Sequence, residues 1–130
     1  MKYLVLLGRI LFAAIFIKAG PAHFAAQTIG YAASKGVPLP SIAVPFSGIM
    51  ACVGGLSIAL GYRAKIGAWL IVLFLVPVTI MIHNFWAVAD PMQAGMQQVH
   101  FMKNLSMLGG ALLIAHFGSG PLSLDGGKDG

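Results

Sequence analysis

The sequence is poor in charged residues, and in acidic ones above all. Only 8% of its 130 residues are charged, and three of them are Asp or Glu. An average soluble domain carries about 25% charged residues. With 58% hydrophobic residues and a mean hydropathy of +0.89, the chain has too little charge to cover a water-facing surface. The composition therefore excludes a soluble domain and indicates an integral membrane protein.

Cysteine is nearly absent. The single Cys52 lies within an apolar run, so an intrachain disulfide and a two-cysteine redox relay are both excluded. The net charge of +5 does not indicate nucleic-acid binding, because the Lys and Arg residues flank apolar runs instead of forming a basic patch. Basic residues in such positions are typical of the ends of membrane spans.

Four apolar runs account for most of the chain. A membrane-spanning helix needs about 20 predominantly apolar residues, and each run approaches or reaches this length. The runs cover residues 3–24, 42–60, 66–85 and 100–117. The sequence therefore predicts an all-α, integral membrane four-helix bundle, with one membrane domain over residues 1–130 and a polar tail at 118–130.

The connections between the runs are polar or contain helix breakers. Residues 27–40 end in Gly-Val-Pro-Leu-Pro and residues 86–99 contain Asp-Pro, so both are predicted to be loops. Four spans place the basic turn 61–65 and both termini on one side, which carries more Lys and Arg than the other. The positive-inside rule then predicts a multi-pass protein with both termini in the cytoplasm.

Small residues recur at helical spacing in the second and fourth runs. They are Ser47, Gly48, Ala51, Cys52, Gly55, Ser106, Gly109 and Gly110. Because small side chains let membrane helices approach closely, these positions predict helix–helix contacts.

Polar residues gather near the outer ends of three runs, which antiparallel threading brings to one membrane level. His100, Lys103 and Asn104 share a helix face by their spacing. No apolar run contains Asp or Glu. We therefore expect Arg9, within the first run, to snorkel to the interface, to bind backbone or amide oxygens, or to meet an anionic or polar ligand. The candidate ligand-binding residues are Arg9, His23, His83, Asn84, Trp86, His100, Lys103 and Asn104.

Two interpretations of this polar cluster stay open. Histidine, amide and lysine donors suit a quinone head group, whose carbonyl oxygens accept hydrogen bonds, or a small oxyanion, and a histidine could supply protons. Haem or a metal is less favoured, since neither an H-E-x-x-H motif nor zinc-type Cys/His spacing occurs. Alternatively, the same residue types form a belt at the level of the lipid headgroups.

Several segments resemble the DoxX family of small bacterial membrane proteins. They are LGRILFAAIFIKAGPAHF, GGLSIALGYRAKIGAWLI, HNFW, HFMKNLSMLGGALLI and GPLSLD, spread from Leu7 to Asp125. The resemblance implies a four-helix bundle in the bacterial cytoplasmic (inner) membrane. It carries over, as motif positions, Arg9, Gly20, Gly55, His83, Asn84, Lys103, Asn104 and Gly109. Two positions depart from the family pattern: Ala51 stands where many relatives have Glu, and His23 where many have Lys.

The residues and the resemblance lead to two main functional hypotheses. The first is a membrane subunit of a redox system that interacts with quinone or with a soluble oxidoreductase partner, because a subunit of thiosulfate–quinone oxidoreductase is among the DoxX relatives. The second is a non-enzymatic membrane scaffold or small carrier, alone or as a homo-oligomer in the lipid bilayer. A transporter or channel is a weaker third, because the polar residues lie at the helix ends. No catalytic residue is assigned.

Overall fold

A computed structural model describes residues 2–125, and all regular secondary structure in this range is helical. The elements are α1 (Lys2–Ala22), α2 (Ala26–Ser34), α3 (Pro40–Leu60), α4 (Ala64–Met81), the 3₁₀ turn η1 (Phe85–Ala87) and α5 (Pro91–Phe117). The prediction of an all-α protein is therefore confirmed.

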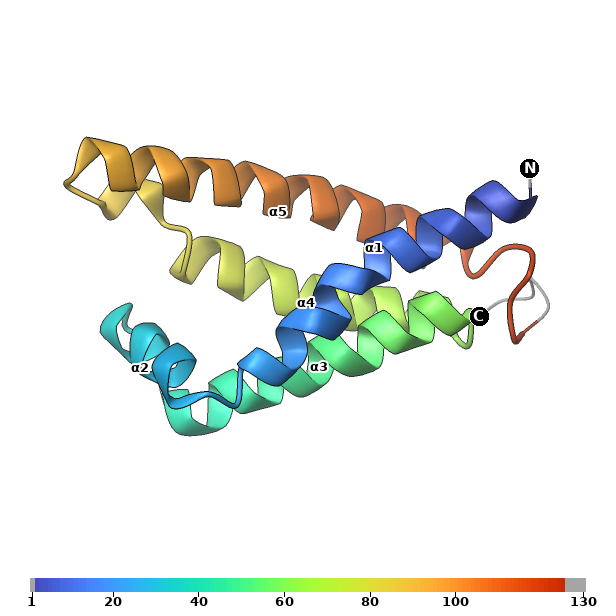
Figure 1. Ribbon diagram of the computed structural model, residues 1–130, viewed down its shortest axis with the longest axis horizontal. Coiled ribbons are helices and arrows are strands. Elements are labelled where there is room, and N and C mark those ends of the chain that lie inside the picture. Colours follow the sequence, from blue (N-terminus) through green and yellow to red (C-terminus); the bar gives the residue numbers. More distant parts are fainter. Residues whose placement is uncertain (1, 126–130) are drawn as a thin grey trace.

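The four long helices lie antiparallel and pack mainly on their neighbours in the chain (Figure 1). α3 lies between α1 and α4, and α5 packs on the other side of α4. The short α2 lies beside the start of α3, at the end of the molecule opposite residue 2. We call the end that carries residue 2 and the α3–α4 turn the terminal end, and the end that carries α2 and η1 the opposite end.

Three helices of the described chain are long and apolar enough to cross a membrane. They are Lys2–Ala22, Pro40–Leu60 and Ala64–Ala87, the last including η1. The predicted count of four spans is therefore not exact, although the bundle does contain four long helices. α5 has 27 residues, more than enough length, but its first half contains Gln97, Gln98, His100 and Lys103, which lower its hydropathy.

Glycines of α3 bring the helix backbones into contact on two sides. A Cβ atom added to Gly48 would lie 2.5 Å from the carbonyl oxygen of Gly20 on α1, and one added to Gly54 would lie 2.9 Å from that of Gly67 on α4. The small residues of the second apolar run therefore pack as predicted. Those of the fourth run differ, because Gly109 has no atom within 4 Å of such a Cβ, while Gly110 faces Phe12.

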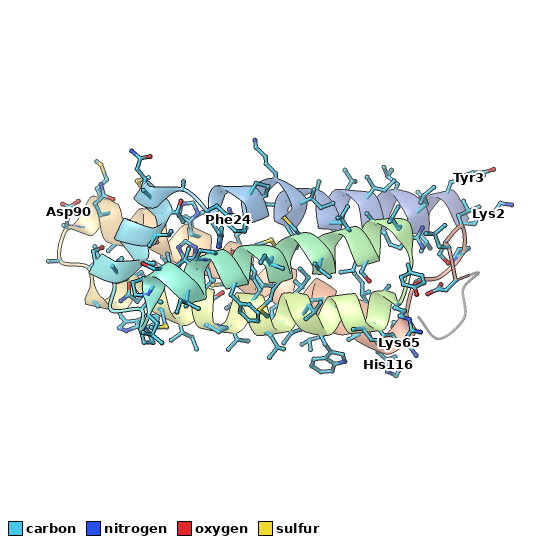
Figure 2. All side chains as sticks on the ribbon, turned by 90° about the horizontal axis from the view of Figure 1, so that it is seen from below. Lys2, Tyr3, Phe24, Lys65, Asp90 and His116 are labelled. Atoms are coloured by element: carbon cyan, nitrogen blue, oxygen red, sulfur yellow. The ribbon has the colours of Figure 1, made fainter. Side chains whose placement is uncertain are left out.

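The core is narrow and the outer surface is apolar. Phe16, Ile58, Ile71 and Leu75 are fully buried between the helices, whereas large apolar side chains such as Trp69 project outward. Figure 2 shows side chains projecting around the whole bundle, with Lys2 at one end and Asp90 at the other. Soluble monomers rarely expose apolar surface on this scale. The chain is therefore a multi-pass membrane protein whose outer face lies in the lipid bilayer.

Two segments that were predicted to be loops contain helix, and both predictions were wrong. Residues 27–40 include most of α2, which the following Gly-Val-Pro-Leu-Pro stretch ends. Residues 86–99 include the first turns of α5, because Asp90-Pro91 begins a helix here instead of forming a turn. The Asp90 carboxylate accepts a hydrogen bond from Gln93 N at 3.1 Å, and Pro91 occupies the first helical position, a common pairing at helix starts.

Candidate functional site

The C-terminal segment, residues 118–125, folds back over the terminal end of the bundle. Leu124 N donates to Leu60 O at 3.1 Å, and Asp125 N donates to Gly61 O at 3.2 Å. These bonds satisfy carbonyl groups at the C-terminal end of α3, which have no partners inside the helix. The part of the predicted polar tail up to Asp125 is thus attached to the bundle, and the remainder, 126–130, lies outside the described residues.

Arg9 holds this segment from within α1. The side chain is 4% exposed, and its guanidinium donates from Nη1 to Ser119 O at 2.7 Å and from Nη2 to Leu122 O. The Asp125 carboxylate, which lies close enough to act electrostatically on Arg9, also accepts from Ser119 Oγ at 2.9 Å. Of the three alternatives expected for Arg9, the structure shows the second, since the C-terminal segment supplies backbone oxygens as acceptors and Asp125 as a nearby carboxylate.

At the opposite end, a cavity of about 280 Å³ lies between α2, α3 and α4. Its walls are mostly apolar, with Val44, Val78 and Ile82 among them, and Tyr31 of α2 also lines it. Pro77 and Met81 line the side formed by the last turns of α4. A few polar groups, described below, face the same space.

His23 is one polar group of the cavity. It follows the last residue of α1, and its Nδ1 lies 2.9 Å from Ser47 Oγ and 3.3 Å from Val44 O. Ser47 Oγ donates its own proton to Val44 O, so Nδ1 of His23 donates to Ser47 and Nε2 is left as the acceptor of the neutral ring. Burial lowers the pKa of His23, which favours this neutral form.

His83 joins the cavity to a group of polar side chains at the opposite end. Its Nδ1 lies 2.8 Å from Gln97 Oε1, and its ring stacks on His100 with a centroid distance of 5.2 Å. Lys35, the residue after α2, donates from Nζ to Asn84 Oδ1 at 3.1 Å. We call these five residues, from the end of α2, the end of α4 and the start of α5, the polar rim.

The structure brings together only some of the predicted site residues. His83, Asn84 and His100 meet in the polar rim, and His23 lies inside the cavity. Trp86 forms edge-to-face contacts with Phe85 and Phe101 beside the rim. Three predicted residues lie elsewhere. Arg9 is at the terminal end, whereas Lys103 is exposed on α5 and Asn104 is buried there.

Two residues of the site were missed in the sequence analysis, and three residues of α5 were placed on one face that the structure divides between buried and exposed surface. Lys35 and Tyr31 were placed in a loop, and the only signal for Lys35 was its position as a lone cation between the first two runs. The predicted common face of His100, Lys103 and Asn104 spans buried and exposed surface, since Asn104 packs inward while Lys103 points outward. Among residues 2–125, no three His, Cys, Asp or Glu side chains converge as a metal site would require.

Known proteins that resemble the chain are membrane proteins. The family model that matches is the SURF4 family, over residues 1–129. Inner membrane protein YphA of Escherichia coli is 32% identical over 98 residues, 75% of this chain and 69% of that protein. Inner membrane protein YqjF of the same organism is 32% identical over 123 residues, 93% of this chain and 88% of that protein.

A eukaryotic relative is matched over a shorter stretch. The ER-derived vesicles protein ERV29 of Saccharomyces cerevisiae is 30% identical over 80 residues, which are 62% of this chain and 26% of that protein. No solved structure gives a significant match.

The resemblance to the DoxX family was therefore wrong. The family model that covers nearly the whole chain is a different one. The segments behind the resemblance consist of apolar helix interiors, small packing residues and polar helix ends, which any small membrane bundle needs and which discriminate poorly between families. The chain belongs to the SURF4 family.

Proposed function

We propose that the protein binds a small, largely apolar molecule in the cavity at the opposite end of the bundle. The observation that carries this proposal is the cavity itself, with apolar walls and a few polar side chains at one edge. Ligand sites in proteins commonly combine apolar walls with a few convergent polar groups, at volumes of roughly 300–1,000 Å³. At about 280 Å³, this cavity suits a single ring or a short chain.

A quinone head group is the first ligand to test. Its carbonyl oxygens accept hydrogen bonds, and the Lys35 ammonium group beside the cavity supplies donors. The proposal retains quinone as a candidate ligand from the sequence analysis. It does not retain the hypothesis of a redox subunit, because that hypothesis rested on the resemblance to the DoxX family. No electron-transfer step is proposed.

We also propose that the protein lies in a bacterial inner membrane with both termini in the cytoplasm. Two relatives are named as inner membrane proteins. The terminal end carries Lys2, Arg63 and Lys65, and the opposite end carries Lys35. The positive-inside rule then places the cavity and the polar rim toward the outer side of the membrane.

The experiment is a binding titration that follows tryptophan fluorescence. The chain has two tryptophans, so Trp69→Phe leaves Trp86, beside the polar rim, as the only reporter. In this background, a short-chain ubiquinone analogue should quench Trp86 in a saturable manner in lipid nanodiscs. Ala43→Leu fills the cavity and should weaken binding about tenfold or more.

Ala14→Leu is the matched control, because Ala14 is exposed on α1 and adds the same atoms outside the cavity. If Ala43→Leu and Ala14→Leu bind the analogue alike, the cavity is not its site. If none of a set of apolar ligands quenches Trp86 in a saturable manner in any variant, the proposed function as a whole is contradicted.

A second candidate, the non-enzymatic scaffold, is favoured by α5. Only Asn104 and Ala111 of its 27 residues are buried, whereas the shorter α4 buries seven. An apolar helix face of this size is available to a second copy of the chain or to a partner helix. Native mass spectrometry of the protein extracted from its membrane should then show a stable oligomer or a stoichiometric partner, while a monomer under all mild extraction conditions contradicts this candidate.

A further inference from the structure

We infer that the molecule held in the cavity is an anionic amphiphile, a single-chain carboxylate such as a fatty acid, with its chain in the cavity and its carboxylate at the polar rim. This inference rests on the proposed function and names the ligand class of that site.

The first observation is the charge at the opposite end. The polar rim holds the ammonium group of Lys35 and two histidine rings, and Lys103 lies one helical turn beyond His100 on α5. The charges of Lys35 and Lys103 both act on His83. Two lysine ammonium groups therefore act on His83 at the cavity wall, one from the end of α2 and one from α5.

The second observation is where the acidic side chains lie. Among the described residues, Asp125 belongs to the terminal end, where it accepts from Ser119 Oγ and from the backbone N of Arg63. Asp90 caps the start of α5 through Gln93 N, ten residues or about 15 Å along the helix before His100. Asp125 thus lies at the other end of the bundle, and Asp90 is engaged in capping α5. The positive charge of Lys35 is therefore left for an anion brought by a ligand.

The third observation is that the rim opens onto the cavity at two points. His83 belongs to the rim and also lines the cavity. Tyr31 lines the cavity as well, and Lys35 Nζ lies 5.7 Å from the centre of its ring. A ligand whose chain lies against Tyr31 and His83 therefore has its polar end within reach of the Lys35 ammonium group.

Lys35 has the donors that such an end group needs. A lysine ammonium group has three N–H donors, and Asn84 Oδ1 takes one of them. The others suit a carboxylate, since hydrogen bonds between an ammonium group and an ionised acceptor are about twice as strong as neutral ones. A neutral head group would accept the same bonds without balancing the charge, and a cationic head group would be repelled. The site is therefore expected to prefer the acid over its ester.

The test compares a charged probe with its neutral counterpart. In the Trp69→Phe protein in phosphatidylcholine nanodiscs, 2-bromoundecanoate at a pH that ionises it should quench Trp86, because its bromine atom lies next to the carboxylate at the rim. Its affinity should be about tenfold or more above that of its methyl ester. Lys35→Met keeps the apolar stem of the side chain and removes the charge, so it should abolish the preference for the acid. Lys35→Arg should retain most of it.

Lys2→Met is the matched control, because it removes one lysine charge at the far end of the bundle (Figure 2) and should leave the preference unchanged. Equal affinities of acid and ester in the unmodified protein, or equal effects of Lys35→Met and Lys2→Met, overturn the inference while the proposed function stands. If neither acid nor ester binds saturably, and quinone analogues and other neutral ligands also fail, the proposed function itself is overturned.

Discussion

Arg9 is a charged side chain in an apolar helix, and the backbone that satisfies it comes from the other end of the chain. An isolated charge at membrane depth is energetically unfavourable. The guanidinium group of Arg9 is stabilised by hydrogen bonds to the carbonyl oxygens of Ser119 and Leu122 and by the nearby carboxylate of Asp125. The arginine also orders a Gly-rich segment that has little apolar side chain to bury. The contacts that stabilise the buried charge of Arg9 are therefore the same contacts that hold the C-terminal segment over the terminal end.

Replacing Arg9 should release the C-terminal segment. Arg9→Met removes both hydrogen bonds to the segment, and bonds to charged groups contribute roughly 1.5–3 kcal/mol each. In a Cys52→Ser background, a cysteine introduced at the fully buried Ser119 should react faster with a water-soluble maleimide in Arg9→Met than in the parent, and the midpoint of thermal unfolding in detergent should fall. Lys18→Met, at an exposed position on the same helix, should change neither. Equal labelling rates in Arg9→Met and the parent would show that the bonds to Leu60 and Gly61 suffice.

At the scale of the element, the helices that hydropathy predicts are those whose outer faces lie in lipid. α1, α3 and α4 have long, predominantly apolar stretches because their outer faces lie in lipid. α2 was missed because its nine residues carry no span-length signal, and so short a helix depends on packing against α3 for stability.

The contact of Arg9 with the C-terminal segment and the cavity at the opposite end could not be predicted from the sequence, because both depend on long-range contacts. Arg9 and Ser119 are 110 residues apart, and no local pattern indicates that a polar, Gly-rich tail returns to the first helix. The convergence of His83, Asn84 and His100 was predicted from antiparallel threading alone. The cavity beside them depends on α2, which the hydropathy pattern does not show.

Helix packing gives a prediction at the same scale. Gly48→Ala places a methyl group against the Gly20 carbonyl oxygen, which is backbone and cannot rotate away, so α1 and α3 must separate. Overpacking of this kind costs roughly 1–3 kcal/mol, and the midpoint of thermal unfolding in detergent should fall. Gly109→Ala makes the same change where the structure leaves open space, and it should be neutral or slightly stabilising because alanine favours helix more than glycine does. Similar midpoints for the two variants would contradict the close approach of α1 and α3.

At the scale of the whole molecule, the two ends have different tasks. The terminal end is closed by the C-terminal segment, and the charge of the buried Arg9 is compensated within the chain by Asp125. The opposite end holds a cavity with a cationic rim. If the rim receives a ligand from the outer side of the membrane or from the outer lipid leaflet, the orientation of the bundle decides which pool of molecules the protein can meet.

Orientation can be measured with single cysteines at the two ends. In a Cys52→Ser background, we place one cysteine at Tyr62, in the exposed turn between α3 and α4, and another at Ala89, in the exposed connection before α5. A maleimide that cannot cross the inner membrane should label the Ala89 cysteine in cells with a permeabilised outer membrane, and the Tyr62 cysteine only after the inner membrane is also opened.

The charge bias behind this expectation is small, because Lys2, Arg63 and Lys65 lie on one side and Lys35 lies on the other. Two lysines added beside Ala89 should therefore shift part of the population to the inverted orientation, where the Tyr62 cysteine becomes the one labelled from outside. Labelling of the Tyr62 cysteine alone in the unmodified background would place the rim in the cytoplasm, and it would require the ligand to come from the inner leaflet.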